Sequence, residues 1–167
     1  EESFRMIFTN WSGDVTSNSS SISLIMSRPV DLKANWGLQY YLNVVSSTGT
    51  TLGSGWYDAG SAATVSVQSP VVWQNDTRQI FNGWNDTTSS QQTTKTVVVG
   101  APSTLRASWK LQYLVQIESS FGNPQGSGWH DAGTEVQISV DPRIDFNNRT
   151  RRIFSGWSGD YLGTAPS

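Results

Sequence analysis

The sequence predicts an all-β protein, a tandem array of small 73-residue β-sandwich-like or β-grasp-like repeats coupled end to end. Three observations predict this class. Long motifs return at one fixed spacing, short runs alternate between apolar and polar residues, and no stretch of about ten residues has helical spacing. A unit this small has little core of its own, so we expect neighbouring units to share buried surface.

The repeat spacing is constant along the chain. Arg5, Arg78 and Arg151 lie 73 residues apart, and each opens an Arg-x-Ile-Phe motif that ends on tryptophan. The segments that share this spacing are 5–11, 78–84 and 151–157; 32–40 and 105–113; and 53–60 and 126–133. We therefore divide the chain into a partial repeat at 1–36 (the C-terminal half of a unit), a complete repeat at 37–109 and a partial repeat at 110–167 (the N-terminal part of a unit).

Every local signal within the repeat favours strands. Residues 63–67 and 136–140 alternate as half-buried strands do, and 40–44 and 113–117 are rich in β-branched and aromatic residues. No turn signal interrupts 32–44, so we expect one unit to run into the next through a long strand. The expected strands are 5–8, 22–26, 32–36, 40–44 and 63–67, with their copies at 78–81, 95–99, 105–109, 113–117, 136–140 and 151–154.

Composition indicates a soluble, nearly neutral, β-rich extracellular protein. Charged residues make up 14% of the chain, the net charge is -2, and eight tryptophans supply large apolar area. This charge gives no basic footprint for nucleic acid. No apolar run approaches the roughly 18 residues that span a bilayer, so no membrane span is expected in this segment. The absence of cysteine excludes disulfides and thiolate metal sites.

The two ends of the chain suggest processing or a longer parent protein. The sequence opens on Glu1 and has no signal peptide, so we expect a processed product or a segment of something longer.

Five sequons for N-glycosylation support an extracellular location. Two of them lie one period apart, in segments 68–77 and 141–150, which we expect to be exposed loops. The candidate asparagines are Asn10, Asn18, Asn75, Asn85 and Asn148.

The repeated aromatic residues allow two interpretations. Trp11, Trp84 and Trp157 end the Ile-Phe strands, and we expect them to close the core of each unit, because indole area is what a small unit lacks. The second interpretation is a sugar-stacking platform on the glycine-flanked aromatic pairs, while a loop aromatic folded over the core explains the same pairs. The candidate stacking residues are Trp56, Tyr57, Trp129 and His130.

The acidic and basic residues give little support to a metal site or to catalysis. Asp58 and Asp131 precede turn glycines and are expected to accept backbone N–H bonds; one acid per unit does not assemble the six to eight oxygens that calcium takes. His130 is the only histidine and no nucleophile motif is present, so we expect no catalytic residues, no metal and no cofactor. The repeated arginines are expected to pair with Asp58 or Asp131, or to stack on a tryptophan face.

The combined pattern resembles the divergent internalin-type B-repeat, which occurs in tandem in bacterial and archaeal surface proteins. The matching segments are 151–160, 105–109 and 126–133, with their copies, and they cover nearly the whole chain. The Ala-x-Trp ending and the Trp-Tyr-Asp-Ala-Gly form are similar to repeats of archaeal cell-surface proteins. The resemblance implies secretion and a stalk, adhesive or coat role, and it brings no catalytic residues.

The expected function is structural. We expect a glycosylated subunit or segment of a cell-surface filament, sheath or coat. Its partners are other copies of itself joined head to tail by strand complementation, or neighbouring repeats of a longer chain. The open edge strands that the partial repeats leave are what invite such pairing. The alternative is an adhesin stalk or glycan-binding module that uses the loop aromatics.

Overall fold

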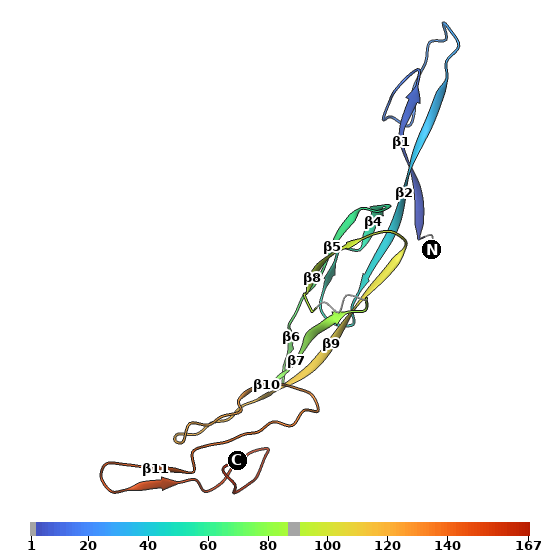
Figure 1. Cartoon of the computed structure of the whole chain (residues 1–167). Helices are drawn as coiled ribbons and strands as arrows, with labels where there is room; N and C mark the ends of the chain where they lie inside the picture. The colour runs from blue at the N-terminus through green and yellow to red at the C-terminus, as the bar shows by residue number, and fades with distance from the viewer. Residues whose placement is uncertain (1–2, 87–90) are drawn as a thin grey trace. The chain divides into compact units, whose positions relative to one another are not determined.

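The computed structural model describes residues 3–86 and 91–167, and these residues form strands and loops without a helix (Figure 1). The all-β prediction is therefore confirmed. No helix among the described residues could cross a membrane. The strands are β1 (Phe4–Gly13), β2 (Leu32–Val45), β3 (Thr51–Leu52), β4 (Gly55–Asp58), β5 (Ala62–Val67), β6 (Val71–Trp73), β7 (Thr77–Trp84), β8 (Thr94–Val98), β9 (Ser103–Val115), β10 (Gly128–Asp131), β11 (Arg143–Asp145) and β12 (Arg151–Ile153).

The chain divides into two compact units. Unit 1 contains the residues up to Ser69 together with Phe81–Trp109, and unit 2 contains Pro70–Ile80 and Lys110–Ser167. β7 and β9 contribute residues to both units.

Long strands form the frame of unit 1. β2 runs without a break from Leu32 to Val45, which confirms the long strand expected from the missing turn signals. β9 is unbroken from Ser103 to Val115. β1 lies antiparallel to the first part of β2, with a bulge between Phe8 and Asn10. The last part of β2 pairs in parallel with the start of β9, from Leu42 opposite Ser103 to Val45 opposite Arg106.

A second sheet of unit 1 has the order β3-β5-β8. β5 alternates as predicted, since Ala63, Val65 and Val67 are buried while the residues between them are not. These side chains pack against Leu42 and Val44 of β2. The buried cluster is completed by Phe81, Trp84, Val99, Leu105 and Ala107, so all its members fall within 37–109.

The motif tryptophans differ in burial. Trp84 is buried in this cluster, as expected, and its indole Nε1 donates to the Gln92 carbonyl oxygen at 3.1 Å. Trp11 and Trp157 are only partly buried and do not belong to the cluster. Each still contacts the phenylalanine three residues before it, Phe8 and Phe154, at ring distances of 5.6 and 5.1 Å.

Two expected strands are absent. Residues 22–26 form no ladder, and 136–140 have only the isolated bridge from Ser139 to Gln125. Both predictions were wrong because a strand needs a neighbour for its backbone hydrogen bonds. In unit 1, β5 and β8 pair with each other. Among the described residues, no segment forms such a ladder with 22–26 or with 136–138.

The two segments expected to be loops contain short hairpins. β6 pairs with β7, and β11 pairs with β12. The turn between β6 and β7 carries Asn75 and Asp76 at positive φ, and the later turn carries Arg149 at φ 64°. Both segments are exposed along most of their length, as predicted, but they include hairpin strands rather than loop alone.

Candidate functional site

In unit 1, the repeated arginine, tryptophan, glutamine and aspartate form one chain of contacts. The Arg5 guanidinium carbon lies 4.5 Å from the centre of the Trp56 ring. Arg5 Nε donates to Gln39 Oε1 at 2.8 Å, and Gln39 Nε2 donates to Asp58 Oδ1 at 2.9 Å. The arginine therefore stacks on the tryptophan, one of the two expected arrangements, and reaches the aspartate through a glutamine.

Unit 2 contains the same chain of contacts 73 residues further on. Arg78 lies 4.5 Å from the Trp129 ring and donates to Gln112 at 2.8 Å. Gln112 donates to Asp131 Oδ1 at 2.7 Å, and Lys110 Nζ lies 3.1 Å from Asp131 Oδ2. The hydrogen bond from Gln112 and then that from Lys110 hold the pKa of Asp131 below its ordinary value of 3.8.

The second aromatic residue of each candidate stacking pair contacts a backbone carbonyl oxygen of a glycine. Tyr57 packs against the buried cluster, and its hydroxyl donates to the Gly53 carbonyl oxygen at 3.0 Å. His130 Nε2 lies 3.0 Å from the carbonyl oxygen of Gly126, the corresponding glycine. Neighbouring residues of a strand point to opposite faces, so the side chains of Trp56 and Tyr57 lie on opposite faces of β4.

A surface hollow of about 690 Å³ lies beside Trp56. The Tyr41 ring meets the Trp56 indole edge-on at 5.3 Å. The remaining lining residues are Ser3, Asn43, Pro102, Ser103 and Thr104. An aromatic wall with hydroxyl and amide groups around it is chemically suited to a polar ligand such as a sugar.

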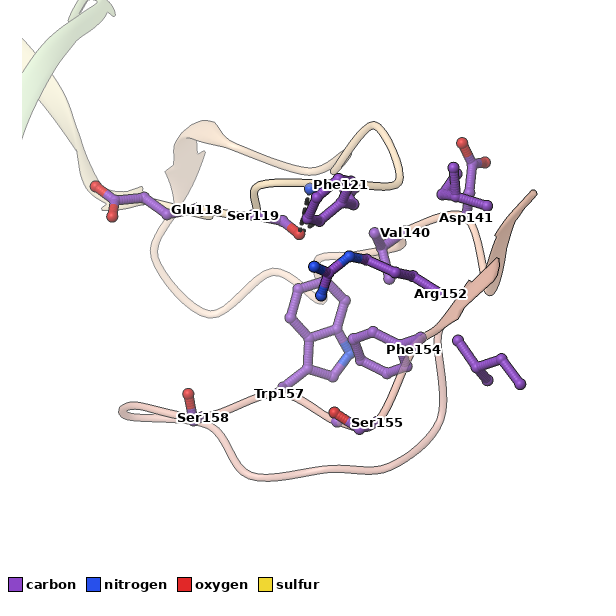
Figure 2. Close-up of a pocket in the computed structure, with 13 residues that line it drawn as sticks. Glu118, Ser119, Phe121, Val140, Asp141, Arg152, Phe154, Ser155, Trp157 and Ser158 are labelled. Atoms are coloured by element: carbon purple, nitrogen blue, oxygen red, sulfur yellow. Dashed lines mark hydrogen bonds between the residues drawn. The ribbon is translucent and has the colours of Figure 1, made fainter. Parts of the chain in front are cut away.

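Unit 2 has a hollow of about 510 Å³ at the place that corresponds to the core of unit 1 (Figure 2). Its apolar wall includes Val140, Phe154 and Trp157, which lie 73 residues after the buried Val67, Phe81 and Trp84. The guanidinium carbon of Arg152 lies 4.5 Å from the centre of the Phe121 ring at this hollow. The hollow is thus an open version of the cluster that is closed in unit 1.

The sequon asparagines differ in accessibility. Asn10 is partly buried, and its Oδ1 accepts from Asn35 Nδ2 at 3.2 Å. Asn85 is exposed, but its Oδ1 accepts from the Arg106 backbone N–H at 2.6 Å, and Thr87 of its sequon lies outside the described residues. The three exposed asparagines whose sequons are described completely are Asn18, Asn75 and Asn148.

Acidic side chains are scattered rather than gathered. Asp14 accepts from the Asp31 backbone N–H at 2.8 Å and pairs with Arg28 at 3.0 Å. These two hydrogen bonds, the backbone one first, hold the pKa of Asp14 below 3.8. Within residues 3–86 and 91–167, no three His, Cys, Asp or Glu side chains are placed to hold a metal ion.

Sequence reasoning missed the two bridging glutamines. Gln39 and Gln112 carry no local signal, because glutamine is common on solvated strands. Their 73-residue spacing within a repeated Leu-Gln-Tyr motif was the signal available.

Comparisons with protein-family models, with curated proteins and with solved structures found no match.

Proposed function

We propose that this chain is an extracellular structural repeat protein, a subunit or segment of a cell-surface filament, sheath or coat. The observation that carries the proposal is the recurrence of one contact set at a 73-residue spacing, from Arg5 on Trp56 to Arg78 on Trp129. Each repeated polar group is occupied by another repeated residue. Such a set stabilises copies of a unit and leaves no reactive group for chemistry.

The finer architecture belongs to the same proposal. The units are small sandwich-like or grasp-like repeats of the internalin B-repeat kind, coupled through the long strands β2 and β9. The exposed hairpin tips at Asn75 and Asn148 are supported as glycan sites by their accessibility. N-glycans there would place the protein on the outside of a cell, and the style of the motifs favours an archaeal one.

Sedimentation velocity over a concentration series, with electron microscopy of the concentrated sample, tests the structural role. We expect rod-like oligomers or filaments that grow with concentration. A monomer at every concentration would contradict assembly from this chain. The intact mass of the native protein before and after chemical deglycosylation tests the location, since an unchanged mass would contradict the glycoprotein proposal.

A glycan-binding module is a second candidate, favoured by the aromatic hollow beside Trp56. Stacking of a sugar ring on this indole would be the main binding contact, since the Trp56 ring lines the hollow. The Trp56→Ala variant should then lose binding on a glycan array while its thermal unfolding stays cooperative. Trp129→Ala is the matched variant in unit 2. If the unsubstituted chain binds no glycan on the array, this candidate is contradicted.

A further inference from the structure

The pairing of β5 with β8 in unit 1 is a template for a contact that unit 2 does not make. β5 and β8 are antiparallel, with Ala62 opposite Val98 and Thr64 opposite Thr96. The inward side chains Ala63 and Val65 of β5 are almost fully buried, at 1% and 0% exposure. Any segment that takes the place of β8 in another copy must therefore supply both a strand edge and an apolar cover.

The counterpart of β5 in unit 2 has one side occupied and the other open. The bridge of Ser139 to Gln125 corresponds to that of Ser66 to Leu52 in unit 1. The N–H of Val140 donates to the Pro166 carbonyl oxygen at 3.0 Å, as the Val67 N–H donates to the Thr93 carbonyl oxygen at 3.0 Å. Beyond this point, residues 135–138 have no ladder partner among the described residues.

The place in unit 1 that corresponds to the hollow of unit 2 is covered by apolar side chains. There the cover comes from Val97 of β8, from Val99 just after it, and from Leu105, Ala107 and Trp109 of β9. The residues at the corresponding positions of the first copy are Leu24, Met26, Leu32, Ala34 and Trp36.

Three of these five first-copy residues are displayed to solvent. Leu24, Met26 and Trp36 are exposed to 38%, 68% and 57%. Burial of such side chains is the main driving force of protein association, at about 25 cal/mol per Å² of apolar area. The chain therefore presents a hollow with an apolar wall and, elsewhere, exposed apolar residues at the positions that correspond to the cover of unit 1.

Charge also matches at this contact. The parallel pairing of β2 with β9 puts Val45 opposite Arg106. The equivalent pair between unit 2 and the first copy is Glu118 with Lys33. Both side chains are exposed, and Glu118 lies at the rim of the hollow (Figure 2). Opposite charges directly across a ladder favour that register.

We infer that residues 22–36 of a second copy of this chain complete unit 2: residues 22–25 pair antiparallel with 135–138, and 30–33 pair in parallel with 115–118. The template gives the register, with Ser23 opposite Gln137 and Lys33 opposite Glu118. Leu24, Met26 and Trp36 then cover the hollow. The inference rests on the proposed assembly function and names its partner and its contact.

Disulfide trapping tests the register, because the chain contains no cysteine of its own. Ser23→Cys protein is mixed with size-tagged Gln137→Cys protein and oxidised. We expect the mixed dimer to form at least about tenfold faster than with the control Glu135→Cys, which lies two residues out of register on the same outward face. Equal trapping of both partners would overturn the register.

Surface variants test the contact without touching the buried cluster. Met26→Asp should raise the concentration needed for assembly by about tenfold or more, because it places a charge where the contact would bury an apolar side chain. Ser23→Asp, on the opposite face of the same segment, is the matched control and should change it far less. Glu118→Lys and Lys33→Glu should each weaken assembly several-fold, and the double variant should restore it.

The outcomes separate this inference from the proposed function. If the unmodified chain stays monomeric at every concentration, the assembly function and this contact fall together. If it assembles but Met26→Asp assembles equally well and the charge reversals do not compensate, the function stands and the inferred contact is wrong. Thermal unfolding of the monomeric variants, unchanged from that of the unmodified chain, excludes an effect through folding.

Discussion

Phe81→Ala is the substitution whose cost the structure defines most sharply. Phe81 lies in β7 at 8% exposure within the buried cluster. Its ring centre is 5.1 Å from that of Trp84 and 6.1 Å from that of Trp109, the second at an interplanar angle of 82°. Truncation removes the buried ring, its aromatic contacts and the packing around it. Losses of this kind cost about 3 to 5 kcal/mol of unfolding free energy.

Phe8→Ala is the matched control, because Phe8 occupies the same motif position one period earlier. Phe8 contacts Trp11 and Trp36 but is only half-buried. Its truncation should therefore cost about 1 to 2 kcal/mol. The motif is thus the same at both positions and only the burial differs.

Urea denaturation followed by tryptophan fluorescence measures both variants, with the transition of unit 1 analysed separately if two transitions appear. If Phe81→Ala does not fold, Phe81→Leu is compared with Phe8→Leu instead, with smaller losses at both positions. The reasoning is refuted if the Phe81 variant costs no more than the same substitution at Phe8, since the buried cluster would then not be where unit 1 gains its stability.

Three further predictions concern the repeated contacts. Arg78→Ala should lower the stability of unit 2 by about 1 to 2 kcal/mol, through loss of stacking and of the bond to Gln112, and Arg78→Lys should not restore it, as chemical denaturation will show. Because the folded pKa of Asp131 is depressed, its contribution to stability is present above pH 3.8 and lost as the pH falls through the folded value; Asp131→Asn should flatten the acid side of the stability profile. Gly53→Ala should cost more than Gly60→Ala in thermal unfolding, since both have positive φ but only at Gly53 does an added Cβ come within 2.5 Å of a backbone oxygen.

Local sequence patterns predicted the elements that carry their own signal. β5 was recognised from its alternation, and β2 from the unbroken run that follows Leu32. Both strands find partners within the described residues, so local preference and tertiary context agree.

Non-local requirements account for the errors. Residues 22–26 and 136–140 have strand composition, yet a strand forms only where another chain segment accepts its hydrogen bonds. Trp157 has the same motif as Trp84 but lies in the open hollow. Trp84 owes its burial to residues distant in the sequence, such as Val99, Leu105 and Ala107, and the motif alone does not specify them.

The candidate stacking residues show a different limit. Trp56 was expected to be a loop aromatic in a glycine-flanked pair, and it lies in strand β4 instead. In a strand, Trp56 and Tyr57 necessarily face opposite ways, so the pair does not form one platform.

The bridging role of Gln39 could not be predicted from its neighbours in the sequence, because only the folded strand register brings it between Arg5 and Asp58.

Hydrogen–deuterium exchange as a function of protein concentration tests the central claim most directly. In dilute solution the amides of 22–25 and 136–138 should exchange rapidly, because they have no ladder partner. In concentrated, assembled protein both segments should become protected together, as the two strands of one ladder must. Assembly that leaves either segment exchanging rapidly would contradict the account.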